Sequence, residues 1–115
     1  MIYPISAPLL DFLMLSIVRQ QDSYGYQISQ QLKKVSGMKD STLYPILRRL
    51  SDNGFVVTYD QPFQGRNRKY YRITDSGEKQ WQFLCQEWQQ YTAAIEEIIN
   101  KKEEFQVGGN NNDKE

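Results

Sequence analysis

Apolar residues recur at helical spacing through the first half of the chain. Residues 7–20 are apolar on most sides, residues 22–37 carry one apolar stripe, and residues 39–54 repeat apolar side chains at i, i+3, i+4 and i+7. These patterns predict three helices. Because the first is apolar all round, we expect it to be buried on several faces, which in so small a protein indicates contact with a second subunit.

Each predicted helix is bounded by residues typical of helix ends. Pro45 is expected in the first turn of the third helix, where its missing amide hydrogen removes no essential bond. A glycine or an Asn-Gly pair follows the last turn of the second and third helices. The candidate N-caps are Ser6, then Asp22 or Ser23, then Asp40 or Ser41, and the candidate stops are Gly37 and Asn53–Gly54.

The period changes after residue 54 from helical to alternating. Two runs rich in β-branched and aromatic residues, FVVTYD and RKYYRIT, are joined by QPFQGRN, which predicts a hairpin with a flexible tip. In the second strand, Tyr71 and Ile73 would face inward and Tyr70 and Arg72 outward, or the reverse.

The last element is predicted as one long helix from about residue 75 to 102, with Thr74 or Asp75 and Glu78 resembling a capping box. Its apolar residues repeat as a heptad seam, and such a seam needs a partner helix. The simplest partner is the same helix of a second subunit. The seam consists of Trp81, Leu84, Trp88, Tyr91, Ile95 and Ile98.

Three helices, a hairpin and a long helix predict a mainly α fold with a small β-hairpin (α+β), namely a winged helix-turn-helix followed by a dimerisation helix. We expect residues 1–74 to form the winged-helix domain and residues 75–104 the dimerisation helix. Residues 105–115 are small and polar, which predicts a disordered tail.

Composition excludes several classes of protein. A chain of 115 residues with 39% hydrophobic content builds one modest core. It has no His and a single Cys85, so we expect no disulfide, no metal site, no cofactor and no enzyme built on a histidine base. The apolar run at residues 7–18 is interrupted by Asp11 and too short to span a bilayer. The sequence therefore predicts a soluble cytoplasmic protein with no membrane partner.

Charge is balanced over the chain, with 14 Lys+Arg against 14 Asp+Glu, but it is unevenly placed. The segment GRNRKYYRIT, residues 65–74, holds four cations and no carboxylate. Arg66, Arg68 and Lys69 would project from the hairpin and meet DNA phosphates or enter the minor groove. The alternative is an ordinary solvated hairpin, because edge strands often carry cations that prevent aggregation.

The third helix would be the recognition helix, with its first turn facing base edges in the major groove. Its polar face offers hydroxyls for phosphates or bases, an aromatic ring and an arginine within reach of the backbone. Alternatively, Ser41 and Thr42 only cap the helix. The candidate DNA-binding residues of this helix are Ser41, Thr42, Tyr44, Pro45 and Arg48.

Trp88 lies in the middle of the heptad seam. In a two-fold dimer it could face its own copy and leave a gap for a flat aromatic molecule, or it could be a large core side chain at an a position.

Three strings together resemble the PadR family of bacterial transcriptional regulators: YGYQISQQL, STLYPILRRL and GRNRKYYRITDSG. The short C-terminal part is similar to the small subfamily that includes multidrug-responsive repressors. The resemblance implies a homodimeric repressor that binds a palindromic operator and releases this double-stranded DNA when an inducer binds.

In the drug-sensing members, a Trp on the last helix pairs with its dimer mate to hold planar drugs. The resemblance therefore implies a ligand role for Trp88, with Phe12, Leu15 and Leu84 as walls. Thr92 lies one turn after Trp88, where an acid would help to hold a cationic drug, so a preference for cations does not carry over. A hypothesis from another class is a winged-helix protein–protein interaction module that holds an acidic partner without specific DNA binding.

Overall fold

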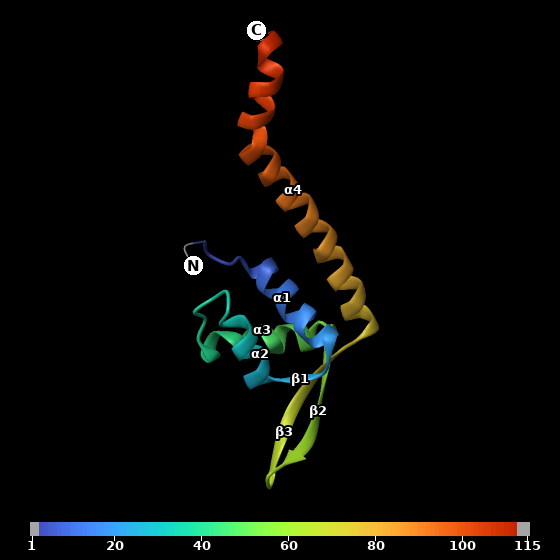
Figure 1. Ribbon diagram of the computed structural model, residues 1–115. Helices are drawn as coiled ribbons and strands as arrows, with labels where there is room; N and C mark the ends of the chain where they lie inside the picture. The colour runs from blue at the N-terminus through green and yellow to red at the C-terminus, as the bar shows by residue number, and fades with distance from the viewer. Residues whose placement is uncertain (1–2, 113–115) are drawn as a thin grey trace. The chain divides into compact units, whose positions relative to one another are not determined.

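The computed structural model describes the backbone of residues 3–112 and the side chains of residues 3–101. It divides into two compact units, residues 1–84 and the part from Cys85 onward, and each is described by itself. Figure 1 shows the elements in chain order. They are α1 (Ala7–Gln20), β1 (Ser23–Tyr24), α2 (Gly25–Leu32), α3 (Asp40–Asp52), β2 (Val56–Phe63), β3 (Arg66–Ile73) and α4 (Asp75–Asn112).

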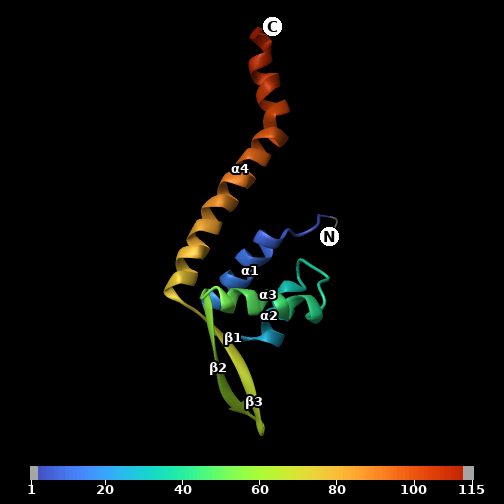
Figure 2. The same cartoon turned by 180° about the vertical axis from the view of Figure 1, so that it is seen from behind.

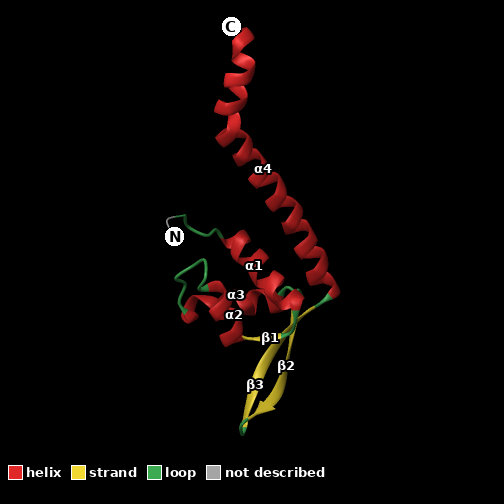
Figure 3. Ribbon diagram, in the orientation of Figure 1, coloured by secondary structure: helices red, strands yellow, loops and turns green. Residues whose placement is uncertain are grey.

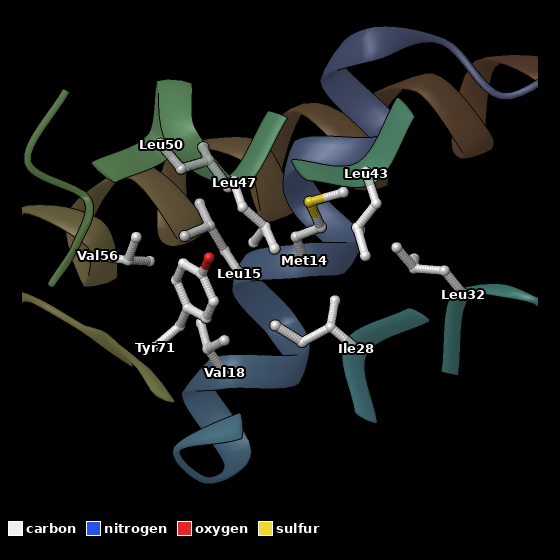
Figure 4. Close-up of a cluster of buried hydrophobic side chains, with 10 residues drawn as sticks. All are labelled: Met14, Leu15, Val18, Ile28, Leu32, Leu43, Leu47, Leu50, Val56 and Tyr71. Carbon is white, nitrogen blue, oxygen red and sulfur yellow. The ribbon is translucent and has the colours of Figure 1, made fainter. Parts of the chain in front are cut away.

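The core of the first unit lies where α1, α2 and α3 meet the base of the sheet. Met14 and Leu15 of α1 lie at its centre (Figure 4), and both are fully buried. The apolar stripe predicted for the third helix is confirmed. That of the second helix is confirmed for Ile28 and Leu32, whereas Tyr24 and Val35 lie outside α2 and are half-buried. Tyr71 faces inward, as in one of the two predicted orientations of its strand. The remaining core residues are Val18, Ile28, Leu32, Leu43, Leu47, Leu50, Val56 and Tyr71.

The sheet is antiparallel with β3 in the middle, in the order β1-β3-β2. Strands β2 and β3 pair along their whole length, from Val56 opposite Ile73 to Phe63 opposite Arg66. They form a narrow ribbon in both views (Figures 1 and 2), which we call the wing. Pro62 is accommodated because β2 is an edge strand.

The tip of the wing is a two-residue turn, and the prediction of a longer flexible tip is wrong. Gln64 and Gly65 both have positive φ, 50° and 79°, which is typical of the tight turns that match the twist of paired strands. Because this turn needs no further residues, pairing continues to the last residue of each strand.

Strand β1 was not predicted (Figure 3). Ser23 pairs with Tyr71 and Tyr24 with Tyr70, so Ser23, one of the two residues expected to cap the second helix, belongs instead to the sheet, and Asp22 precedes this strand. The helix α2 begins at Gly25, with Tyr24 as its N-cap. It ends at Leu32, and the chain continues in turns before the predicted stop at Gly37.

The other helix ends follow the sequence in part. The Leu9 amide donates to Ser6 Oγ at 3.4 Å, which confirms Ser6 as the N-cap of α1. The N-cap of α3 is Lys39, and the predicted caps are wrong because Asp40 is already helical and accepts a bond from Ser29 Oγ at 2.8 Å. Pro45 lies inside α3 and not in its first turn.

The predicted stop of α3 is confirmed at Asn53, followed by Gly54 at φ +80°. At the start of α4, Thr74 Oγ1 accepts from the Gly77 amide at 2.9 Å and donates to the Gly54 carbonyl at 2.6 Å. Glu78 does not complete the predicted capping box, because the third helical residue after the cap Thr74 is Gly77. The Glu78 carboxylate binds Arg19 instead.

Helix α4 runs to Asn112, further than the pattern predicted. The side chains of residues 102–112 and all of residues 113–115 lie outside the described part, so a disordered tail over residues 105–115 stays a prediction, as do the predicted domain boundaries. Along the described residues, no helix is both long and apolar enough to cross a membrane.

Candidate nucleic-acid interface

Helix α3 has one buried and one exposed face. Leu43, Leu47 and Leu50 are each 1% exposed and fix the helix on the core. The opposite face is open, and it carries every residue of this helix that the sequence put forward for DNA binding. These candidate residues, all exposed, are Ser41, Thr42, Tyr44, Pro45 and Arg48.

Tyr44 is held beside the start of α2. A methyl group added at Gly25 would lie 2.6 Å from the Tyr44 hydroxyl oxygen, so the phenol rests against the bare glycine backbone. The same ring borders a pocket of about 380 Å³ that α2, α3 and the wing line together. The pocket is lined by Tyr24, Gly25, Tyr26, Tyr44, Arg68, Lys69 and Tyr71. Tyr44 of α3 and two wing cations are therefore neighbours on one surface.

The four cations of the wing are not equivalent. Arg72 is tied down, because its Nε and Nη2 each lie 3.0 Å from Asp22 Oδ2. Arg66 and Lys69 are exposed. Arg68 is half-buried, with its guanidinium carbon 4.0 Å from the ring centroid of Tyr24 and 3.6 Å from that of Phe63.

Arg68 and Arg72 belong to one continuous chain of stacked groups on the wing. Tyr24 meets Tyr70 edge to face, with centroids 5.5 Å apart, and Tyr70 stacks on Tyr59 at the same distance. The guanidinium carbon of Arg72 lies 4.9 Å from the Tyr59 ring centroid. Contacts of these kinds stabilise by a fraction of a kcal/mol to about 1.5 kcal/mol each. We call the set the aromatic–guanidinium ladder: Phe63, Arg68, Tyr24, Tyr70, Tyr59 and Arg72.

Asp22 binds the end of this ladder that Tyr59 and Arg72 form. Its Oδ2 accepts the Tyr59 hydroxyl at 2.7 Å as well as the Arg72 guanidinium. The hydrogen bond to Asp22 is the main reason that the pKa of Tyr59 is raised above its ordinary value, because it favours the protonated phenol. Sequence reasoning missed Asp22, Tyr24 and Tyr59, since their roles depend on the strand β1 and on the register of the hairpin.

Two further arginines form intramolecular ion pairs. Arg49 Nη2 lies 2.6 Å from Asp11 Oδ1, and this hydrogen bond raises the pKa of Arg49. Arg19 Nε lies 2.8 Å from Glu78 Oε1. Within residues 3–101, the ion pairs of the structure thus take up Arg19, Arg49 and Arg72. Of the candidate DNA-binding cations, Arg48, Arg66, Arg68 and Lys69 are in none of these pairs.

Trp81, predicted for the dimer interface, makes contacts inside its own unit. Its Nε1 donates to Ser16 Oγ at 2.8 Å, and the Arg19 guanidinium carbon lies 3.9 Å from its ring centroid. Phe12 lies 6.1 Å away, centroid to centroid. Whether Trp81 also contacts a second subunit stays a prediction.

The predicted ligand residues differ in accessibility. Phe12 and Leu84 are half-buried. Leu15 is fully buried in the core, where a ligand would reach it only if that core opened. Trp88, in the second unit, is 39% exposed. The part of the chain with described side chains holds no cluster of three or more metal-ligating residues.

The second unit carries an exposed apolar stripe. Tyr91 lies 6.1 Å from Trp88 between ring centroids, and Thr92 Oγ1 donates to the Trp88 carbonyl at 3.0 Å. An exposed stripe of this kind on a helix marks an interaction surface. Its members are Trp88, Tyr91, Ile95, Ile98 and Ile99, between 37% and 75% exposed.

A small helical core, an exposed third helix and a cationic wing beside it define a winged helix-turn-helix of the DNA-binding class. Residues 14–82 match the sequence model of the transcriptional regulator PadR-like family. The chain belongs to this family, whose members are transcriptional regulators and not enzymes, and the expected resemblance is confirmed.

Solved structures of related proteins have the same fold. The smu.1704 protein of Streptococcus mutans is 51% identical, with a TM-score of 0.84 over 87% of this chain and 94% of its own. A PadR family transcription regulator of Clostridium difficile is 29% identical, with a TM-score of 0.72 over 78% of this chain and 97% of its own.

The negative transcriptional regulator PadR of Bacillus subtilis is a longer relative. It is 33% identical over 78 residues, which are 63% of this chain and 42% of that protein. Its crystal structure in complex with operator DNA matches with a TM-score of 0.60 over 64% of this chain and 45% of the other. This chain therefore spans less than half the length of that regulator.

Proposed function

We propose that the protein is a homodimeric cytoplasmic repressor that binds a palindromic operator with the exposed face of α3 and the wing. The observation that carries this proposal is the shared pocket, where Tyr44 of α3 borders Arg68 and Lys69 of the wing. A duplex that places base edges against α3 brings its phosphates to these cations. The operator complex of the Bacillus subtilis regulator supports the same use of the fold.

Binding to the DNA upstream of the protein's own gene tests the proposal. We expect a shift in gel-retardation titrations that random DNA of equal length does not compete away. Arg66→Ala should weaken binding to all sequences and lower the salt slope by about one. Thr42→Ala should instead change the preferred sequence. Lys79→Ala, an exposed cation on α4, is the matched control and should bind as the wild type does. Equal affinity for random DNA would contradict the proposal.

The apolar stripe of the second unit supports the dimer. Ile98, 75% exposed, and Tyr91, 61% exposed, would leave water if the same helix of a second subunit packed on them. Ile98→Glu should therefore shift the sedimentation profile from dimer to monomer, whereas Glu97→Gln, on the same exposed helix, should not. A monomeric wild type at working concentration, also in the presence of operator, would contradict this part.

We further propose that a planar aromatic molecule binds at Trp88 and releases the DNA, with Phe12 and Leu84 as candidate walls and Leu15 reached only on opening of the core. The chain has two tryptophans, so Trp81→Phe leaves Trp88 as the sole indole reporter. We expect planar aromatic compounds to quench this variant's fluorescence and to weaken operator binding. A flat response over a broad panel would instead assign Trp88 to packing alone.

A further inference from the structure

We propose that Tyr24 and Phe63 are positioning residues that hold Arg68 in a fixed orientation as the ordered DNA contact of the wing. This inference deepens the proposed function and rests on DNA binding by the wing. It separates Arg68 from Arg66 and Lys69, which the sequence alone treats as one cationic group.

Two aromatic side chains lie against the guanidinium of Arg68. Its guanidinium carbon lies 4.0 Å from the centroid of Tyr24 and 3.6 Å from the centroid of Phe63, so two aromatic rings contact one planar cation. Cation–π attraction favours a guanidinium over each ring face. The N–H donors of arginine lie in the plane of the group, so they point past the rings and stay available for phosphate or base acceptors.

The Tyr24 ring is held in place by its neighbours, and Phe63 is placed by the backbone pairing of its strand. Tyr24 pairs with Tyr70 through the backbone of β1 and β3 and meets its ring at 5.5 Å. Phe63 is the last residue of β2 before the two-residue turn, opposite Arg66. The ladder then continues through Tyr59 to Asp22, which binds the wing to the α1–α2 connection. Because the Tyr24 ring is held by this network, it keeps the Arg68 guanidinium ordered before DNA binds.

Arg68 also has a defined position relative to α3. Arg68 and Tyr44 line the same pocket, so an ordered guanidinium lies at a fixed place beside Tyr44 on the exposed face of α3. An exposed arginine loses side-chain freedom when it binds DNA, whereas an arginine already ordered has little left to lose. Among the described residues, neither Arg66 nor Lys69 contacts an aromatic ring through its charged group.

A double-mutant cycle on operator affinity tests the proposal. Tyr24→Leu should weaken binding roughly tenfold, about the combined effect of the lost ring contact and the regained freedom of the arginine. In the double variant with Arg68→Ala, Tyr24→Leu should cause no further loss of operator affinity. In the double variant with Lys69→Ala, the two losses of affinity should multiply. Tyr24→Phe keeps the ring and should bind as the wild type does. Arg68→Lys keeps the charge but loses the planar group and its fixed donors, so it should bind more weakly than the wild type and more tightly than Arg68→Ala.

Nuclear magnetic resonance relaxation of the Arg68 Nε–Hε group supplies a readout without DNA. We expect this group to be ordered in the wild type and in Tyr24→Phe, and mobile in Tyr24→Leu, with the Arg66 group mobile in all three. If Tyr24→Leu fails to fold, Phe63→Leu at the 45% exposed Phe63 replaces it.

Operator affinity and the order of the Arg68 side chain together distinguish a failure of the positioning role from a failure of the proposed function. The positioning role would be overturned if Arg68 stayed ordered in a folded Tyr24→Leu variant. It would also be overturned if the losses of operator affinity from Tyr24→Leu and Arg68→Ala multiplied in the double variant. If Arg68 is ordered in the wild type but the protein shows no preference for operator over random DNA, the proposed function is overturned. The role of Tyr24 and Phe63 in DNA binding would then fall with it.

Discussion

The phenol of Tyr44 rests against Gly25, where a methyl group would come within 2.8 Å of its Cε1 atom and still closer to its hydroxyl. Gly25→Ala should therefore displace the Tyr44 ring from its place beside the wing. Because the displaced atoms are the far end of a flexible side chain, we expect a stability change below about 1 kcal/mol. Selection of binding sites from random DNA should then give a changed consensus, and an unchanged consensus would refute a reading role for Tyr44.

Gly77 is required for the packing of the first turn of α4. A Cβ at this position would overlap the carbonyl oxygen of Phe55 and lie 2.7 Å from Ile73 Cγ1. Since a backbone carbonyl cannot swing aside, Gly77→Ala should cost about 1–3 kcal/mol in urea unfolding. Gly37→Ala is the matched control, because nothing lies within 4 Å of the added methyl group. Equal stability of the two variants would contradict this packing.

Stability should fall at alkaline pH. The Asp22 hydrogen bond raises the pKa of Tyr59, and burial, ahead of the smaller effect of Tyr44, raises the pKa of Tyr71. A raised pKa in the folded state means stabilisation that is complete below the unfolded value of about 10 and is lost as the pH rises through the folded value. Asp22→Asn should lower the pKa of Tyr59 in a tyrosinate absorbance titration. Asp60→Asn, which changes a carboxylate on the same strand as Tyr59, should leave this pKa unchanged.

The bond from Trp81 to Ser16 fastens α4 to α1 inside the first unit. Trp81→Phe removes the donor, and we expect a loss of about 0.5–1.5 kcal/mol in thermal or urea unfolding. Ser16→Ala should cost a similar amount, and the double variant should lose less than the sum of the two. Strict additivity would mean that the 2.8 Å bond contributes nothing to stability.

Helical periodicity predicted the core well because burial and spacing are linked directly. Leu43, Leu47 and Leu50 share one face of any α-helix, so their burial follows from the sequence without knowledge of the partner elements. The family strings added the fold and the class of function, and the match to residues 14–82 confirms them.

Local sequence could not predict features that depend on pairing between distant segments. Ser23 and Tyr24 look like the start of a helix, and only β3 makes them a strand. Arg68 and Phe63 meet because a two-residue turn sets the register of the wing, and a one-residue slip would move them to opposite faces. Arg68 contacts two aromatic rings and Arg66 does not, and this difference depends on contacts between segments that are distant in the sequence.

Pro62, near the tip of β2, has a consequence for how the protein behaves when concentrated. β2 forms an open edge of the sheet, and an incoming strand from another molecule would find no backbone donor at this proline. Edge-to-edge aggregation is thereby obstructed beside the wing cations, which must stay accessible to DNA. Pro62 therefore helps to prevent the wings of different molecules from pairing.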